Sequence, residues 1–231
     1  MRRIRMHTKA LAIITVVAIG LPDAVSGAPP SSSVEARRTL QRYARCTVKH
    51  KRQLASSAVV EDWPTSMLIA KKLIVSDCLT GEGVLSTLPA AMNAALGEAL
   101  AVSEQNELPP AQVAAAPALA IRAAQYPSNI RPDQMKKVAD SYQTYVTEAK
   151  LGECVVRGDP ANSRLLLDTK IGGNDELAAA TRLVPALSRC VAAGVRIELT
   201  SEIIREAVGV SYYRMEMAAR GQMWRPSAAT K

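Results

Sequence analysis

The chain has 231 residues, a formal net charge of +8, and no phenylalanine among its 48% hydrophobic residues. Beyond residue 21, no apolar stretch approaches the roughly 20 residues that a bilayer span needs, which excludes a transmembrane span in the mature chain. Long runs of alternating β-branched residues are missing, whereas apolar residues recur every three or four positions. This spacing predicts an all-α fold.

The first 27 residues have the three-part layout of a secretory signal peptide. A basic start from Arg2 to Lys9 is followed by an apolar segment at residues 10–21 and by small residues around Gly27. The apolar segment is shorter than a bilayer span, so cleavage after Ser26 or Gly27 is favoured over an uncleaved membrane anchor. We therefore expect a periplasmic or secreted protein.

Removal of the signal peptide leaves a mildly basic chain. Four basic residues and Asp23 leave with residues 1–26, which lowers the net charge from +8 to +5. This charge favours contact with anionic membranes, cell-wall polymers or acidic partners without requiring one.

The mature chain contains two cysteine pairs of similar spacing. Cys46 and Cys78 are 32 positions apart, and Cys154 and Cys190 are 36 positions apart. An even number of cysteines in an exported chain most simply forms two disulfides, with three possible connectivities. A metal site is the rival interpretation, but the close Cys-x2–4-Cys spacing is absent and histidine is scarce. We therefore expect no metal and no cofactor.

A short sequence repeat selects one of these connectivities. The tripeptides Ala-Leu-Gly and Ala-Val-Gly end at Gly97 and Gly209, each 19 positions after the second cysteine of its pair. This recurrence predicts one module that is present twice, each copy closing its own loop. In the chain-entropy model, a disulfide over such a loop stabilises the fold by about 3–4 kcal/mol. The predicted disulfides are Cys46–Cys78 and Cys154–Cys190.

The first module is predicted over residues 34–105, after a flexible leader at residues 28–33. It is expected to hold four helices, at residues 34–48, about 53–61, 65–78 and about 87–105. Trp63-Pro64 ends the second helix, Thr65 or Ser66 caps the third, and Pro89 is tolerated in the first turn of the fourth. A turn at residues 80–83 follows the third helix.

Residues 106–131 are rich in proline and alanine. They are expected to form a linker that holds one short helix at residues 118–124, or alternatively a loop packed across the first module. The sequence favours neither.

The second module is predicted over residues 132–220 and repeats the helical plan. Its expected helices run from residue 132 to about 154, over residues 161–167, from about 175 to 190, and from about 201 to beyond Tyr212. Asn174 caps the third of these helices, and Thr200 or Ser201 caps the fourth. Residues 221–231 are expected to form a flexible tail.

Part of the second module resembles a known kind of protein. The sequences Gly-Glu-Cys-Val-Val-Arg-Gly-Asp-Pro at residues 152–160 and Leu-Val-Pro-Ala-Leu at residues 183–187, with Cys190 and Gly194, are similar to a pattern in exported alphaproteobacterial proteins, especially those of sphingomonads. The similarity covers residues 142–213, and the first module fits it more loosely. The resemblance implies export, helices and paired cysteines, and it carries no activity and no site residue.

The sequence contains no catalytic constellation. His50 is the histidine of the mature chain, and no serine or cysteine near it lies in a nucleophile-elbow pattern. We interpret His50 as an exposed residue on a basic helix face. Neither a phosphate-binding loop nor a dinucleotide-binding glycine motif is present.

Two pairs of glutamates are the remaining candidates for catalysis, Glu148 with Glu153 and Glu202 with Glu206. A glycan hydrolase needs two carboxyl groups held across a cleft, roughly 5–9 Å apart. The alternative interpretation is structural: Glu202 complements the N-terminus of its helix, and Glu206 is a surface partner of a neighbouring side chain.

A basic stripe is the strongest binding signal. Arg38, Arg42, Arg45 and Lys49 lie on one face of a helix with 3.6 residues per turn. They are candidates for binding the headgroups of anionic lipid or lipopolysaccharide, and the alternative is a solvated helix face. Export and the scarcity of aromatic stacking partners argue against nucleic acid.

Arg157 and Arg164 form a second candidate binding site. Two guanidinium groups held side by side could bind a carboxylate or a phosphate. The alternative, which we favour, is internal pairing with Asp159 and Asp168.

These observations favour an exported, non-catalytic interaction protein of the cell envelope. It is expected to bind a protein or an anionic surface component through its helical faces. Two alternatives stay open: a cell-wall hydrolase that uses carboxylates, and an envelope stress or inhibitor module.

Overall fold

The structure, a computed structural model, describes residues 34–61, 63, 65–79, 89–103, 107–121, 131–191 and 199–223. The predicted signal peptide, the leader at residues 28–33, the turn at residues 80–83 and most of the predicted tail lie outside the described residues. All described residues belong to one unit, Ser32–Lys231. None of the helices within these ranges is long and apolar enough to cross a membrane.

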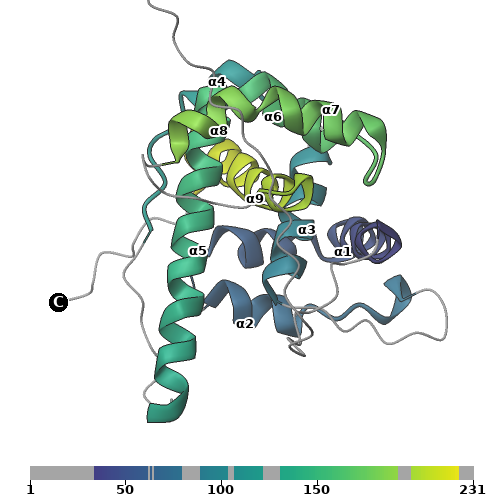
Figure 1. The fold of residues 1–231 in the computed structure, drawn as a ribbon. Coiled ribbons are helices and arrows are strands. Elements are labelled where there is room, and N and C mark those ends of the chain that lie inside the picture. The colour runs from purple at the N-terminus through teal and green to yellow at the C-terminus, as the bar shows by residue number, and fades with distance from the viewer. Residues whose placement is uncertain are drawn as a thin grey trace, which may run out of the picture. The chain divides into compact units, whose positions relative to one another are not determined.

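The described residues form helices and no strands, as the apolar spacing predicts (Figure 1). In chain order the elements are α1 (Val34–Val60), α2 (Thr65–Lys72), the short 3-10 helix η1 (Ser76–Cys78), α3 (Pro89–Val102), α4 (Pro110–Ala114), α5 (Pro132–Gly158), α6 (Pro160–Asp168), α7 (Asn174–Arg182), α8 (Val184–Cys190) and α9 (Ser201–Ala219).

Helix α1 is one kinked helix where the sequence predicted two. Lys51 has non-helical backbone angles, with φ −137° and ψ 47°, and the helix resumes after it. The kink lies in the gap between the two predicted helices, at residues 48–53. The position of the break was therefore predicted, but no loop separates the two parts.

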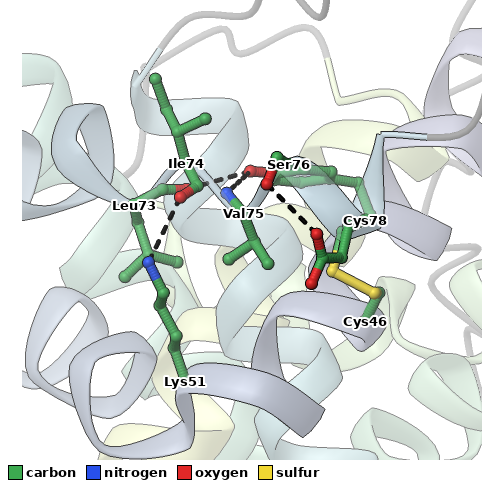
Figure 2. The surroundings of a disulfide bond; sticks show 9 residues. Cys46, Lys51, Leu73, Ile74, Val75, Ser76 and Cys78 are labelled. Carbon is green, nitrogen blue, oxygen red and sulfur yellow. Dashed lines mark hydrogen bonds between the residues drawn. A yellow bond between two sulfur atoms is a disulfide. The ribbon is translucent and has the colours of Figure 1, made fainter.

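Helix α2 ends at Lys72, well before the predicted end at Cys78. The Tyr43 hydroxyl donates to the Leu73 carbonyl at 3.1 Å and accepts from the Val75 amide at 2.9 Å. Lys51 Nζ donates to the Ile74 carbonyl at 3.3 Å (Figure 2). Side chains of α1 thus form the hydrogen bonds that these backbone groups would otherwise form within a helix. The backbone after Lys72 is therefore stable in an extended conformation.

The described part of the predicted linker is packed on the second module. Its helix is α4, at Pro110–Ala114, and the prediction of a helix at residues 118–124 was wrong, because residues 118–121 are not helical. Helix α4 packs against α5, α6 and α9. Val113 is fully buried in these contacts and Ala116 nearly so, which explains why this short segment is held in place.

The predicted helix from residue 175 to 190 is interrupted. Helix α7 ends at Arg182, and α8 begins at Val184 with Pro185 in its first turn. Proline has no N–H for a helical hydrogen bond, and its ring clashes with the preceding turn, so a continuous helix does not pass through it.

Of the two caps predicted in the second module, one was right and one was wrong. The Thr200 side chain accepts a hydrogen bond from the Ile203 amide at 3.2 Å, which confirms the cap at the start of α9. Gly173, and not the predicted Asn174, occupies the N-cap position of α7.

The helices pack around the pair formed by α3 and α9. Helix α1 packs on α3, α5 packs on α9, and buried side chains of both modules form one hydrophobic core. The predicted disulfides are confirmed: Cys46–Cys78 joins α1 to η1 (Figure 2), and Cys154–Cys190 joins α5 to the end of α8. The fold is all-α, with two helical modules that are each closed by one disulfide.

The glycines of the sequence repeat meet where α3 crosses α9. A Cβ atom at Gly97 would lie 2.8 Å from the Cα of Val210, and a Cβ atom at Gly209 would lie 3.2 Å from the Cβ of Glu98. Each glycine therefore contacts the residue that follows the other glycine in the chain. Only residues without a side chain allow the two backbones to approach so closely.

Candidate functional site

An open cavity of about 530 Å³ lies between α3, α5 and α9. Most of its wall is apolar, and Trp63 and Leu68 of the first module also line it. Small-molecule sites in proteins are of this size and combine an apolar wall with a few polar groups. The cavity is therefore the candidate binding site.

Helix α5 lines the cavity with one face over about three turns. The lining residues from Lys137 to Ala149 recur at three- and four-residue spacing, which places them on one side of the helix. At 1.5 Å per residue they cover about 18 Å of helix. Ser141, Thr144 and Glu148 are polar members of this face, so the cavity is elongated and has a polar stripe along one wall.

Glu148 of α5 and Glu206 of α9 both line the cavity. The pKa of Glu206 is raised to about 7, chiefly by burial and then by the negative charges of Glu202, Glu148 and Glu98, which outweigh the positive charge of Arg37. Burial also raises the pKa of Glu148, although part of that residue stays exposed to solvent. The cavity thus holds two acids whose charges repel each other.

Asn93 of α3 adds a third polar group to the cavity wall. Asn93 is 3% exposed, and within the described part of the chain its Oδ1 has no hydrogen-bond partner. A buried acceptor without a donor costs about 1–3 kcal/mol. A ligand that donates a hydrogen bond to this oxygen would remove that cost.

The structure brings together one acid from each predicted pair. Glu153, the neighbour predicted for Glu148, accepts from Arg157 at 2.7 Å and lies outside the cavity lining. Glu202 also lies outside the lining, in the first turn of α9, with its carboxylate 3.8 Å from Arg37. Glu206 is half-buried in the cavity wall and is not the exposed surface residue of the structural interpretation.

The predicted basic stripe is divided by the structure. Arg38 is half-buried, and its Nε donates to the Ile171 carbonyl at 2.9 Å, which ties α1 to the loop between α6 and α7. Arg42, Arg45 and Lys49 are exposed on α1. Binding of an anionic component by these three cations stays a prediction.

Arg157 is held by internal contacts. It pairs with Glu153 and not with the Asp159 that the sequence suggested; Asp159 instead caps α6 by accepting from the Asn162 amide at 3.1 Å. The remaining donors of Arg157 reach carbonyl oxygens at 2.7–2.9 Å, those of Ala114, Ala116 and Pro117. The guanidinium therefore fastens the segment after α4 to α5.

Arg164 also has internal partners. It pairs with the predicted Asp168 at 3.1 Å and with Glu107 at 3.0 Å, and it donates to the Ala101 carbonyl at 3.0 Å. These contacts join α6 to the chain that follows α3. The geometry favours the structural interpretation of both arginines over a shared anion site.

Cys46, His50 and Cys78 have side-chain ligand atoms within 4.8 Å of one another. Both sulfur atoms are bonded in the disulfide, so neither offers the thiolate that binds a metal. His50 is exposed, in agreement with its interpretation from the sequence.

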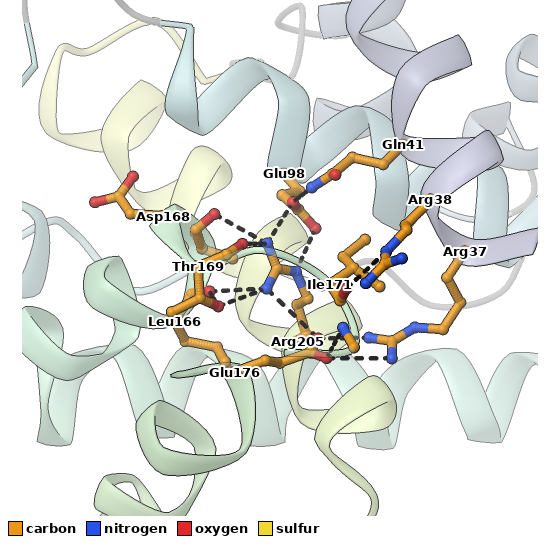
Figure 3. A network of polar contacts seen from close by, with 12 residues as sticks. Arg37, Arg38, Gln41, Glu98, Leu166, Asp168, Thr169, Ile171, Glu176 and Arg205 are labelled. Atoms are coloured by element: carbon orange, nitrogen blue, oxygen red, sulfur yellow. Dashed lines mark hydrogen bonds and ion pairs between the residues drawn. The ribbon is translucent and has the colours of Figure 1, made fainter. Parts of the chain in front are cut away.

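Arg205 of α9 forms a buried network that the sequence did not reveal (Figure 3). It is 3% exposed and donates to both carboxylate oxygens of Glu98 on α3, at 2.7 and 2.8 Å. Glu176 of α7 lies 3.5 Å from Arg205 and 2.6 Å from Arg37 of α1. Arg205 also donates to backbone carbonyls at 2.9–3.0 Å, those of Leu166, Leu167 and Thr169.

This network connects the two modules. A buried ion pair is tolerated only when its charges and remaining hydrogen-bond groups are satisfied, and here the guanidinium has carboxylate and carbonyl acceptors around it. We assign it a structural role, because it fixes α9 relative to α3 and so fixes two walls of the cavity.

Comparisons of the chain with protein-family models, with curated proteins and with solved structures found no match. The functional argument therefore rests on the geometry and chemistry of the cavity.

Proposed function

We propose that this chain is an exported binding protein whose site for a small amphiphilic molecule is the cavity between α3, α5 and α9. The observation that carries the proposal is the combination of an apolar wall with the buried Asn93, whose Oδ1 has no hydrogen-bond partner in the part of the chain that the structure describes. An apolar body would remove the wall from water, and one hydrogen-bond donor would satisfy the amide oxygen.

Two further features support the proposed export and the internal repeat. Disulfides persist in oxidising compartments, so the two disulfides support export to the periplasm or medium. The reciprocal contacts of Gly97 and Gly209 support the internal repeat, since related halves are expected to meet through equivalent positions.

The test uses Trp63 as the reporter, because it lines the cavity. The chain has two tryptophans, so Trp224→Tyr leaves Trp63 as the single one. Mature protein recovered from the periplasm is titrated with dodecylamine, dodecanol and dodecanoate, each below its micelle-forming concentration. We expect a saturable change in Trp63 emission with one-to-one stoichiometry for at least one of them.

A matched pair of variants shows whether binding occurs in the cavity. Ala90→Phe places a large side chain at the cavity wall and should abolish the saturable signal. Ala178→Phe makes the same change on the exposed face of α7, outside the cavity lining, and should leave the signal unchanged. If none of the three amphiphiles binds saturably, or if Ala90→Phe binds as the wild type does, the proposed function is wrong.

A carboxylate-dependent cell-wall hydrolase is the second candidate, favoured by the presence of Glu148 and Glu206 in one cavity. A pKa near 7 suits a carboxyl group that acts as a general acid. Incubation with purified peptidoglycan should then release new reducing ends, and Glu206→Gln should abolish the release. No release by the wild-type protein would exclude this candidate and leave the binding proposal in place.

A further inference from the structure

We infer that the cavity selects amphiphiles with a cationic, hydrogen-bond-donating head, a primary amine or a guanidinium, on an apolar body. This inference rests on the proposed function and names the class of ligand. It follows from three observations: the acids of the cavity, the unpaired oxygen of Asn93, and a comparison of the two repeat halves.

The comparison of the halves shows what the cavity lacks. Aligning Gly97 with Gly209 places Glu98 opposite Val210 and places Asn93 opposite Arg205. Glu98 and Arg205 form the buried ion pair of the network, whereas Val210 and Asn93 both line the cavity. On one side of the α3–α9 crossing, the first half supplies the carboxylate of Glu98 and the second half supplies the guanidinium of Arg205. On the other side, the equivalent positions supply neither charge.

The cavity nevertheless contains acceptors for a cation. Glu206 and Glu148 line it from two different helices, and Asn93 lines it from the third, with a buried Oδ1 that has no hydrogen-bond partner among the described residues. The cation among the lining residues is Lys137, and it lies on α5 eleven residues before Glu148, about 16 Å along the helix axis. Lys137 is therefore too far along the helix to pair with Glu148. Arg37 acts on Glu206 from outside the lining and pairs with Glu176 and Glu202, so a ligand cation at the acidic end would supply a counter-charge from within the cavity.

The length of the site matches an amphiphile whose head and body occupy different ends. The face of α5 that lines the cavity extends about 18 Å, and most residues of the other walls are apolar. A chain of about twelve carbons fits this length when extended. Burying this chain removes the apolar wall from water, which favours binding, while the head remains with the acids.

The inference also predicts a dependence of binding on pH. The charged groups that act on Glu206 come from its own and the neighbouring helices, and they are Glu202, Glu148, Glu98 and Arg37. With a pKa near 7, about one tenth of Glu206 is ionised at pH 6 and about nine tenths at pH 8. Since a cation binds the ionised form, its affinity should rise about tenfold over this interval.

The head group is tested with the three dodecyl compounds, which share one apolar chain. We expect dodecylamine to bind about tenfold or more tightly than dodecanol at pH 8, and dodecanoate to bind most weakly, because each charge interaction of about 1.4 kcal/mol changes affinity tenfold. Dodecylamine affinity should fall about tenfold at pH 6, and dodecanol affinity should not change with pH.

Variants test whether the two acids of the cavity cause the preference for a cationic head. Glu206→Gln should remove the preference for dodecylamine over dodecanol and its pH dependence, and Glu148→Gln should weaken the preference in part. Glu35→Gln makes the same change on an exposed site of α1 and should alter neither. The folded state of each variant is checked by circular dichroism.

The outcomes separate this inference from the proposed function. If dodecanol or dodecanoate binds as tightly as dodecylamine, the cavity is a site for amphiphiles and the inference about the cation is wrong. The inference is equally wrong if Glu206→Gln retains the full preference. If no compound binds, the proposed function fails first. The head-group comparison uses the native cavity, so it is decisive even when a variant does not fold.

Discussion

Replacing Gly152 with alanine should loosen the contact between α5 and α9, which form two walls of the cavity. A Cβ atom at Gly152 would clash with the Ala207 carbonyl oxygen and the Ser211 hydroxyl, and it would lie 2.9 Å from the Ala207 carbonyl carbon. The Ala207 atoms belong to the backbone of α9, so no side-chain rotation relieves the clash. The two helices must move apart instead.

The magnitude follows from two opposing effects. Alanine favours a helix interior over glycine by about 1 kcal/mol. Overpacking a well-packed contact costs about 1–3 kcal/mol, and a clash with rigid backbone falls at the upper end of that range. We therefore expect Gly152→Ala to lower the free energy of unfolding by about 2 kcal/mol, which corresponds to a fall in Tm of about 4–8 °C for a chain of this size.

A second glycine of the same helix provides the control. A Cβ atom at Gly158 would lie 3.4 Å from the Arg189 guanidinium and 3.5 Å from the Ala186 Cβ, which are ordinary contact distances. Gly158→Ala should therefore be neutral or slightly stabilising. The assay is thermal and urea unfolding of the oxidised mature protein, followed by circular dichroism at 222 nm.

The position of Gly152 also connects stability to binding. Glu148 lies one helical turn before Gly152, and Glu206 is next to Ala207 in the chain. Movement of α5 away from α9 should separate these two acids and weaken dodecylamine binding. Equal stability of Gly152→Ala and Gly158→Ala would refute the close packing on which this reasoning depends.

Three further predictions concern charges. Arg205→Met leaves Glu98 buried without its cation and should lower the free energy of unfolding by about 3–5 kcal/mol, measured by urea denaturation; a loss below about 1 kcal/mol would contradict the buried network. The pKa of Glu206 is raised in the folded state, so its contribution to stability is present below pH 4.5 and is lost as pH rises toward 7. Stability from pH 4.5 to 7 should fall less steeply in Glu206→Gln, and an unchanged slope would argue against the raised pKa. Reversing Arg45 and Lys49 to glutamate should weaken binding to vesicles of phosphatidylglycerol by about fivefold or more per residue, measured by co-sedimentation, if the exposed part of the basic stripe binds anionic surfaces.

Several local features could be predicted because their causes lie within a few residues. Apolar spacing predicts the helices, Thr200 predicts a cap, and the cysteine spacing with the Gly97 and Gly209 repeat predicts the disulfide pairing. The break before Pro185 also has a local cause, because proline interrupts a helix, but we expected one continuous helix from about residue 175 to 190.

Other features depended on contacts between distant segments. Helix α2 stops early because Tyr43, about 30 residues earlier, bonds to the extended backbone that follows it. Arg205 is buried on α9, and its partner Glu98 is 107 residues away in the chain. No local pattern identifies such a partner.

By itself, the sequence determined a helical chain with two disulfide-closed modules, because periodicity, capping and cysteine spacing act over short distances along the chain. Only the tertiary structure decided which glutamates line the same cavity. Glu148 and Glu206 come from different predicted pairs and share a cavity with Asn93, because the close approach of α9 to α3 and α5 places one face of each helix around the same space. The chemistry of the site is set by that packing, since burial and neighbouring charges, and not residue type, raise the pKa of Glu206.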